Sequence, residues 1–163
     1  MAKAIPDGYH TLTPSFTFKS SKKAIEFYQK AFSAKVLDVF QNPAGEGIMH
    51  ATIQIGDSIV MMGDEMPASG CKSAETLGSS PINLFVYVPN ADAAFNQAVA
   101  AGCTVGMPVA DMFWGDRAGQ VKDPFGYSWM VATHTQDLTQ EQIRKVAEAF
   151  FSQMVKKENG GRF

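Results

Sequence analysis

The stretch that decides the fold begins at Phe113-Trp114-Gly115-Asp116-Arg117, turns at Asp123-Pro124-Phe125-Gly126 and returns through Tyr127-Ser128-Trp129-Met130-Val131-Ala132-Thr133-His134. Asp, Pro and Gly stand at the first, second and fourth positions of the tetrapeptide, where a type I turn prefers them. The turn predicts two strands that fold back on each other, and the aromatic and β-branched residues after it are typical of a buried strand. The segment before it places an indole ring and a guanidinium on a connecting loop, where we first look for a ligand.

The composition indicates one well-buried domain without polyanionic partners. The chain has 163 residues, of which 45% are hydrophobic and 18% charged, so a sizeable core is expected. The 14 basic and 16 acidic residues give a net charge of −2 and no electrostatic reason to bind nucleic acid or an anionic membrane. No apolar run approaches the ~20 residues of a transmembrane helix. The first residues lack the apolar core of a signal peptide, so we expect a cytoplasmic protein.

The first half of the sequence predicts a βαβββ unit. Residues 12–18 alternate between apolar and polar side chains, which predicts a strand. Ser20 or Ser21 can cap the following helix, whose apolar residues over 24–32 recur at the spacing of a single stripe. Three further strands are predicted at 35–41, 48–55 and 58–62.

The same order of elements recurs about 70 residues later. Asn90 can cap a second helix, which ends at Gly102. The strands of this half are expected at 82–88, 104–111, 117–122 and 127–133. The sequence therefore predicts an α+β fold of one domain, residues 1–163, with module one at 9–63, a linker at 64–81 and module two at 82–134.

A further helix is predicted after the second module. Thr139-Gln140-Glu141-Gln142 fits a capping box, which predicts a C-terminal helix over residues 139–155. Its apolar stripe includes Phe150 and Met154 and must cover something apolar. That surface is either part of the same domain or a second subunit.

The paired βαβββ units with Asp123-Pro124-Phe125-Gly126 before the last strand resemble the vicinal oxygen chelate superfamily, which includes glyoxalase I, extradiol dioxygenases and bleomycin-binding proteins. The finer resemblance is to its PhnB-like branch and rests on motifs along nearly the whole chain: Gly8-Tyr9-His10-Thr11, Ala24-Ile25-Glu26-Phe27-Tyr28, Met49-His50-Ala51, Ile55-Gly56-Asp57-Ser58, Phe113-Trp114-Gly115-Asp116-Arg117 and Ala132-Thr133-His134. The resemblance implies two modules whose mixed sheets form a cup, with helices outside and a ligand inside. It also implies a homodimer, and leaves open whether the cup is built within one chain or across two.

In the metalloenzymes of this family, the ligands lie on the first and last strand of each module and face the cup. The corresponding residues of this chain are Thr13, Met61, Asn83 and Met130. None is the His or carboxylate that such a site requires. Many PhnB-like relatives have His where this chain has Phe85 and Tyr127. We therefore expect no cofactor and no catalytic metal, with a bound divalent metal as the alternative.

The ligand-binding candidates are residues expected to face the cup or its rim: His50, Met61, Asn83, Phe85, Tyr87, Trp114, Arg117 and Met130. His50 could exchange a proton with a ligand, or could only hydrogen-bond a neighbouring Thr. Arg117 could hold a carboxylate, phosphate or sulfonate, or could form a solvated ion pair with the preceding Asp. Trp114, on a loop beside a Gly, is expected to be contact surface rather than core. His10 and His134 lie near strand ends and are assigned structural roles.

Two functions remain as hypotheses. The first, which we favour, is a metal-free protein that binds a planar or amphipathic small molecule by stacking between Trp114, Phe85 and Tyr87, as the resemblance to bleomycin-sequestering members implies. The second is a metal-dependent lyase or dioxygenase of the glyoxalase type, which the missing ligands disfavour. A methyltransferase, a label sometimes given to PhnB-like domains, is discounted because no Gly-rich strand-to-helix turn for a nucleotide-like cofactor is present.

Overall fold

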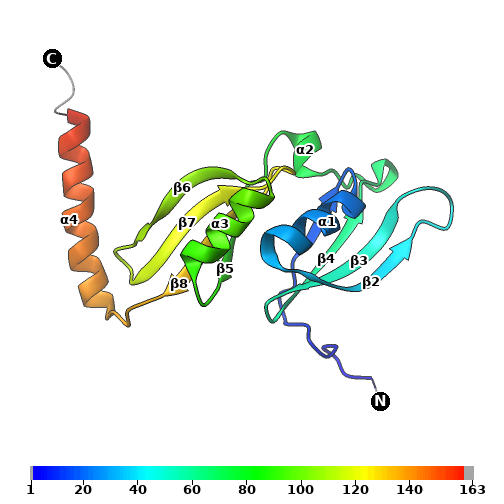
Figure 1. The fold of residues 1–163 in the computed structure, drawn as a ribbon, viewed down its shortest axis with the longest axis horizontal. Helices are drawn as coiled ribbons and strands as arrows, with labels where there is room; N and C mark the ends of the chain where they lie inside the picture. Colours follow the sequence, from blue (N-terminus) through cyan, green and yellow to red (C-terminus); the bar gives the residue numbers. More distant parts are fainter. Residues whose placement is uncertain (1, 160–163) are drawn as a thin grey trace.

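The computed structural model describes residues 2–159 and contains two four-stranded sheets that lie side by side, each with a helix packed on it (Figure 1). Sheet one consists of β1 (Ser15–Phe18), β2 (Lys35–Gln41), β3 (Ile48–Ile55) and β4 (Ser58–Asp64), and sheet two of β5 (Asn83–Tyr87), β6 (Thr104–Asp111), β7 (Asp116–Lys122) and β8 (Ser128–His134). The strand orders are β1-β4-β3-β2 and β5-β8-β7-β6. In each sheet the first and last strands of the module pair in parallel and the other pairs are antiparallel. The predicted α+β fold with a repeated βαβββ order is confirmed.

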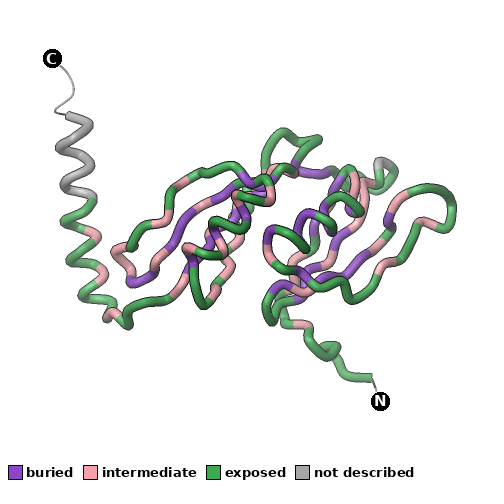
Figure 2. Tube along the Cα trace, viewed as in Figure 1, coloured by how far each residue is buried: buried purple, intermediate pink, exposed green. Residues whose placement is uncertain are grey.

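The helices begin where the capping residues predict. The helices are α1 (Ser21–Phe32), α2 (Ala74–Leu77), α3 (Ala91–Ala101) and α4 (Gln140–Asn159), with a 3-10 turn at Pro67–Ser69. The side chains of Ser20 and Asn90 accept hydrogen bonds from the first turns of α1 and α3. Figure 2 shows buried residues along the inner strands and on the sides of α1 and α3 that face them. Within residues 2–159 no helix combines the length and apolar character needed to span a membrane.

Three segments differ from the prediction. β1 begins at Ser15 rather than at residue 12, and Leu12 is 86% exposed, because the chain before β1 makes a local turn in which the Thr13 hydroxyl donates to the carbonyl of His10. Residues 64–81, predicted as a linker, carry the 3-10 turn and α2, which is capped by the buried Ser73. The guanidinium expected on the connecting loop belongs to β7, because that strand begins at Asp116, one residue before the predicted strand 117–122.

The Asp123-Pro124-Phe125-Gly126 turn is held by the buried side chain of its first residue. One carboxylate oxygen of Asp123 accepts hydrogen bonds from the backbone N–H groups of Phe125 and Tyr127, at 3.0 and 2.9 Å. The other oxygen accepts from the Tyr28 hydroxyl at 2.6 Å and from the Trp129 indole at 2.9 Å. Because Tyr28 belongs to α1, this carboxylate joins the turn of module two to the helix of module one.

The two modules also meet along a shared aromatic layer. The rings of Phe16 and Tyr127 stack with centroids 4.8 Å apart, and the Tyr127 hydroxyl donates to the carbonyl of Thr17 at 2.9 Å. On the helix side, α1 packs against α3, and the Gln97 side-chain amide donates to the carbonyl of Lys30. The modules therefore share one core within a single chain.

Replacing Asp123 with Asn should lower the free energy of unfolding by ~2–4 kcal/mol, because each carboxylate oxygen accepts from two donors and one of the two oxygens becomes an amide N–H donor. If the amide N–H replaces the oxygen that faces Tyr28 and Trp129, the hydroxyl can rotate to accept but the indole N–H loses its acceptor. Tyr28→Phe is the matched control; it removes one donor, leaves the turn intact and should cost only ~1.5 kcal/mol. Urea unfolding followed by tryptophan fluorescence measures both. Equal losses for the two variants would contradict the central role given to the carboxylate.

Candidate functional site

The alternation along β7 and β8 separates two faces of sheet two. Gly119 lies against the ring of Phe95 on α3, and its cross-strand partner Val131 is fully buried on the same side. The residues on either side of Gly119 in β7 and of Val131 in β8 point to the opposite side of the sheet. We call this other side the distal face of sheet two, which consists of Asn83, Phe85 and Tyr87 from β5, Asp116, Ala118 and Gln120 from β7, and Met130, Ala132 and His134 from β8.

Four of the predicted ligand-binding residues share the distal face. Phe85 and Met130 are cross-strand partners, and Asn83 and Tyr87 flank Phe85 on the same strand. Phe85 and Tyr87 are 54% and 61% exposed, and their rings lie nearly parallel with centroids 6.4 Å apart. The strand therefore presents a continuous aromatic surface to solvent, of the kind that binds flat apolar molecules.

A buried carboxylate forms the polar centre of this face. Asp116 is only 3% exposed and accepts three side-chain hydrogen bonds. One of its oxygens lies 2.8 Å from Nδ1 of His134, and the other accepts from the Tyr87 hydroxyl at 3.0 Å and the Trp114 indole at 2.8 Å. Burial alone would raise the pKa of Asp116, but the bonds from His134, Tyr87 and Trp114 outweigh it and hold the pKa below its usual value. The carboxylate is therefore ionised at neutral pH.

The Trp114 loop is fixed at both of its ends. Gly115 has φ +98°, and a Cβ there would collide with the carbonyl oxygen of Gln136, so the position requires Gly. The Gly115 carbonyl in turn accepts from the N–H groups of Thr135 and Gln136, both at 2.9 Å. With its indole N–H bound to Asp116, the half-buried Trp114 ring has a set orientation at the end of the distal face.

His134 is the exposed member of the polar centre. Its side chain is 53% exposed, and Nε2 lies 3.1 Å from a carboxylate oxygen of the fully exposed Asp137. Hydrogen bonds to Asp116 first, and then to Asp137, raise the pKa of His134 above its ordinary value. Pairing with the buried Asp116 fixes the ring, whereas the bond to Asp137 is open to solvent.

Two further candidates lie on sheet one. His50 and Met61 are half-buried and lie on the side opposite Ala51 and Ile53, which are fully buried. Nε2 of His50 lies 3.2 Å from the hydroxyl of Thr52, which is the local hydrogen bond that the sequence left open as an alternative. These side chains belong to a different sheet from the Asp116 centre.

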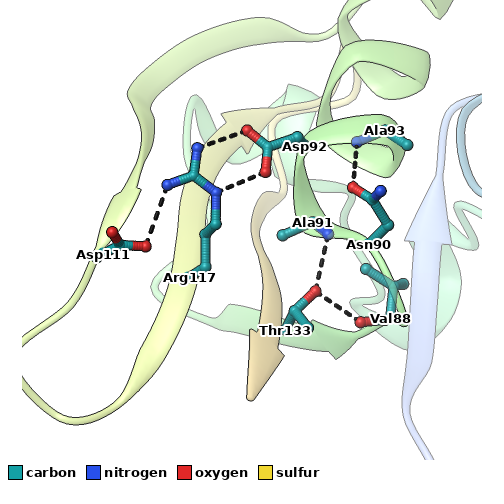
Figure 3. Close-up of polar contacts among 8 residues, drawn as sticks. All are labelled: Val88, Asn90, Ala91, Asp92, Ala93, Asp111, Arg117 and Thr133. Atoms are coloured by element: carbon teal, nitrogen blue, oxygen red, sulfur yellow. Dashed lines mark hydrogen bonds and ion pairs between the residues drawn. The ribbon is translucent and has the colours of Figure 1, made fainter. Parts of the chain in front are cut away.

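Arg117 lies on the opposite side of sheet two from the distal face (Figure 3). Its guanidinium donates to both carboxylate oxygens of Asp92 on α3, at 2.6 and 2.7 Å, and to Asp111 at 3.1 Å. The neighbouring Thr133 hydroxyl donates to the carbonyl of Val88 and accepts from the first N–H of α3 (Figure 3). Arg117 therefore anchors the start of α3 and lies away from the distal face.

A groove of about 820 Å³ runs between the two modules. Of the eight predicted site residues, Phe85 and Tyr87 line it, together with residues from β1, the β3–β4 turn, α1 and α3. The edge strand β5 thus borders both the groove and the distal face.

The positions that would hold a metal do not fit one. Thr13 lies outside β1 and its hydroxyl is bonded to the carbonyl of His10, while Met61, Asn83 and Met130 offer thioether and amide groups. A divalent metal centre of the family's kind needs imidazole or carboxylate ligands at these places. No group of three or more His, Cys, Asp or Glu side chains with metal-binding geometry occurs in residues 2–159.

Asp116 and His134 were missed as site residues, although the sequence contains the signal. In the β7–β8 hairpin, residues at equal distance from the turn are paired, from Lys122 and Ser128 outward to Asp116 and His134. Counting outward from the turn therefore places a carboxylate opposite an imidazole. The remaining partners, Tyr87 and Trp114, come from other segments and could not be found by this count.

Comparison with known proteins agrees with the fold. The model of the Glyoxalase/Bleomycin resistance protein/Dioxygenase superfamily matches residues 13–131. An uncharacterized protein of Mycobacterium bovis is 35% identical over 136 residues, which cover 82% of this chain and 89% of the relative. Among solved structures, TioX from Micromonospora sp. ML1 is similar with a TM-score of 0.60 and 24% identity over 77% of this chain and 98% of its own. Protein PA1353 from Pseudomonas aeruginosa has a TM-score of 0.62 and 23% identity over 78% of this chain and 99% of its own.

His134 should titrate above the ordinary pKa of a histidine, and Asp116→Asn should bring that pKa down because it removes the charge at Nδ1. Since the folded pKa exceeds the unfolded one, the stabilisation from this pair is complete below the unfolded pKa and is lost as the pH rises through the folded pKa. Histidine ring NMR, with the three histidines assigned by substitution, measures the titration. Identical midpoints for His134 in both proteins would show that Asp116 does not control it.

Proposed function

The chain belongs to the glyoxalase/bleomycin resistance protein/dioxygenase superfamily, and we propose that it binds a planar small molecule on the distal face of sheet two without a catalytic metal. The observation that carries the proposal is the exposed aromatic surface of Phe85 and Tyr87 beside a Trp114 ring that Asp116 holds in place. A flat ligand gains by burying these rings, and a pre-oriented indole loses little conformational freedom on binding. Asn83 and Met130 supply an amide and an adaptable thioether on the same face.

The donor chemistry supports binding over metal catalysis. By the resemblance, Met61, Asn83 and Met130 correspond to places where the family's metalloenzymes carry imidazole or carboxylate ligands, and thioether and amide groups are poor ligands for Zn²⁺, Mn²⁺ or Fe²⁺. His50 alone, hydrogen-bonded to Thr52, does not make up a ligand set. The alternative of a metal-dependent lyase or dioxygenase would need further ligands.

We extend the proposal to a homodimer in which a second copy covers exposed apolar surface of the first. Phe85 and Tyr87 are more than half exposed in the single chain. At the other end of the molecule, α4 stands away from both sheets (Figure 1), and Val146 and Phe150 on it are each 47% exposed, although Phe150 contacts the ring of Phe113. Exposed apolar groups in this number favour a protein partner, and a second copy is the partner always present. The predicted stripe also includes Met154, whose side chain lies outside the described residues.

Trp114→Ala should weaken binding of the aromatic dye 8-anilinonaphthalene-1-sulfonate, which offers a naphthalene ring for stacking, by about 2 kcal/mol, roughly thirtyfold, while the melting temperature stays close to that of the wild type. Trp114→Phe is the matched control, because it keeps a ring and loses only the bond to Asp116. Dye fluorescence titration before and after dialysis against a chelator measures affinity and metal dependence together. If Trp114 were core, Trp114→Ala would instead destabilise the protein by ~3–5 kcal/mol. Stoichiometric Ni, Zn, Fe or Mn retained through His50 would favour the metalloenzyme.

Light scattering at micromolar concentration should report twice the 17.7 kDa mass of one chain. Val146→Glu places a charge on the exposed apolar stripe of α4 and should shift the protein toward monomer. Arg144→Glu, a charge change at an exposed position of the same helix, is the control and should leave the mass unchanged. A 17.7 kDa species in the wild type would contradict the dimer.

A further inference from the structure

We propose that Asp116 and His134 form a proton-accepting pair for the ligand of the distal face, and that this ligand is a planar aromatic compound with a weakly acidic hydroxyl group. The inference rests on the proposed function, because it requires a small molecule on this face. It is carried by the geometry around His134, where one ring nitrogen is held by a buried carboxylate and the other lies 3.1 Å from the carboxylate of the fully exposed Asp137.

The hydrogen bond to Asp116 determines which nitrogen of His134 can accept a proton. Nδ1 lies 2.8 Å from an oxygen of Asp116, a carboxylate that is 3% exposed and can only accept. In the neutral ring the hydrogen therefore sits on Nδ1, and Nε2 carries the lone pair. Because the His134 side chain is 53% exposed, that lone pair can be reached by a ligand.

An anionic oxygen already occupies the position that the ligand's oxygen would take. Asp137 places a carboxylate oxygen 3.1 Å from Nε2, and its own side chain is fully exposed. An ion pair this exposed contributes little, so a ligand oxygen can displace it at small cost. Because a carboxylate oxygen can only accept, Nε2 carries a hydrogen while Asp137 is bound, and this contact is that of the protonated ring. The chain thus shows that an oxygen anion is accommodated at Nε2–H, which is the state that follows proton transfer from a ligand to the neutral ring.

The surroundings of the pair favour an aromatic ligand. The Tyr87 hydroxyl and the Trp114 indole N–H both donate to Asp116, so their polar atoms are satisfied and their rings remain as apolar surface next to the imidazole. A flat ring packed on this surface would direct a hydroxyl substituent toward Nε2. On sheet one, Nε2 of His50 instead faces the uncharged Thr52 hydroxyl and lacks such a carboxylate-held geometry.

The proton transfer needs no co-reactant. The O–H bond of the ligand breaks and leaves its electron pair on oxygen, while an N–H bond forms at Nε2, so the combined charge of ligand and ring does not change. The resulting imidazolium lies between the ligand oxyanion and the Asp116 carboxylate. The charged groups that face His134 are Asp116 from β7 and Asp137 from the segment after β8, and Tyr87 of β5 reaches it through Asp116. Both carboxylates raise the pKa of the ring, which stabilises the protonated product.

The test uses 4-nitrophenol, whose ionised form absorbs visible light, and 4-nitroanisole, which has the same ring and no acidic proton. In the wild type, bound 4-nitrophenol should be half ionised about one pH unit below the free compound, a tenfold bias toward the phenolate. His134→Asn keeps a donor toward Asp116 but removes Nε2, so it should abolish the shift for whatever 4-nitrophenol still binds. Asp116→Asn should reduce the shift, and Asp111→Asn is its matched control, since it removes an equal charge from the opposite side of the sheet.

Asp137→Asn removes the competing anion and should bind 4-nitrophenolate ~2–5-fold more tightly.

Bound 4-nitrophenol that ionises at the same pH as the free compound would overturn the proton-accepting pair. Binding of 4-nitroanisole to the same protein would then leave the proposed function standing. An equal shift in the His134→Asn protein would also overturn it. Failure of 4-nitrophenol to bind would overturn the ligand class, and the dye titration then decides separately whether the face binds planar molecules.

Discussion

The carboxylate of Asp123 is the interaction on which the rest of the structure depends. It is 4% exposed and accepts hydrogen bonds from the backbone of Phe125 and Tyr127, the Trp129 indole and the Tyr28 hydroxyl. Burial raises its pKa, and the bonds from Tyr28, Trp129 and the backbone oppose that rise. Its four donors come from a turn, a strand and the helix of the other module. One side chain therefore closes the hairpin and joins the two βαβββ units.

The register that this turn sets also positions the candidate site. Pairing proceeds without a bulge from Lys122 and Ser128 to Asp116 and His134, so a slip of one residue at the turn would separate the carboxylate from the imidazole. Asp116, at the start of β7, resembles Asp123, which follows the end of the strand. Both are buried carboxylates that accept hydrogen bonds from side chains of other segments. The difference is exposure: His134 reaches solvent, whereas the donors to Asp123 lie in the core.

The sequence predicted the elements well wherever the evidence was local. The turn residues and the caps at Ser20 and Asn90 depend only on neighbouring residues, and these are parts that the structure confirms. Leu12 misled the strand prediction because alternation does not reveal that pairing with β4 begins only at Pro14 and Ser15. Residues 64–81 were harder still, because the small hydroxyl residues that looked like a linker include Ser73, the cap of α2.

The site was less predictable because its assignment depends on which side of a strand each residue occupies. Arg117 looked like a ligand-binding group beside Trp114, yet it shares a face with Gly119 and is bound by Asp92 of α3. Asp116, its neighbour in sequence, lies on the distal face and was read only as its ion-pair partner. The sequence pattern does not show which of Asp116 and Arg117 faces a ligand, since both are charged residues at the start of a strand. The residue that binds Arg117, Asp92 of α3, lies 25 residues earlier in the chain.

The two faces of β7 divide structural and binding roles in a way that bears on the proposed function. On the helix side, Arg117 is fixed by carboxylates of α3 and β6, and on the distal face Asp116 is held by Tyr87, Trp114 and His134, so neither contact at the start of the strand needs Phe85. The distal face can then keep Phe85 and Tyr87 exposed, because the core does not need their burial. A rigid strand below an exposed aromatic surface is what a pre-organised binding site requires. If the second copy also covers these rings, the ligand would lie between two chains, and binding and dimerisation would stabilise each other by linkage.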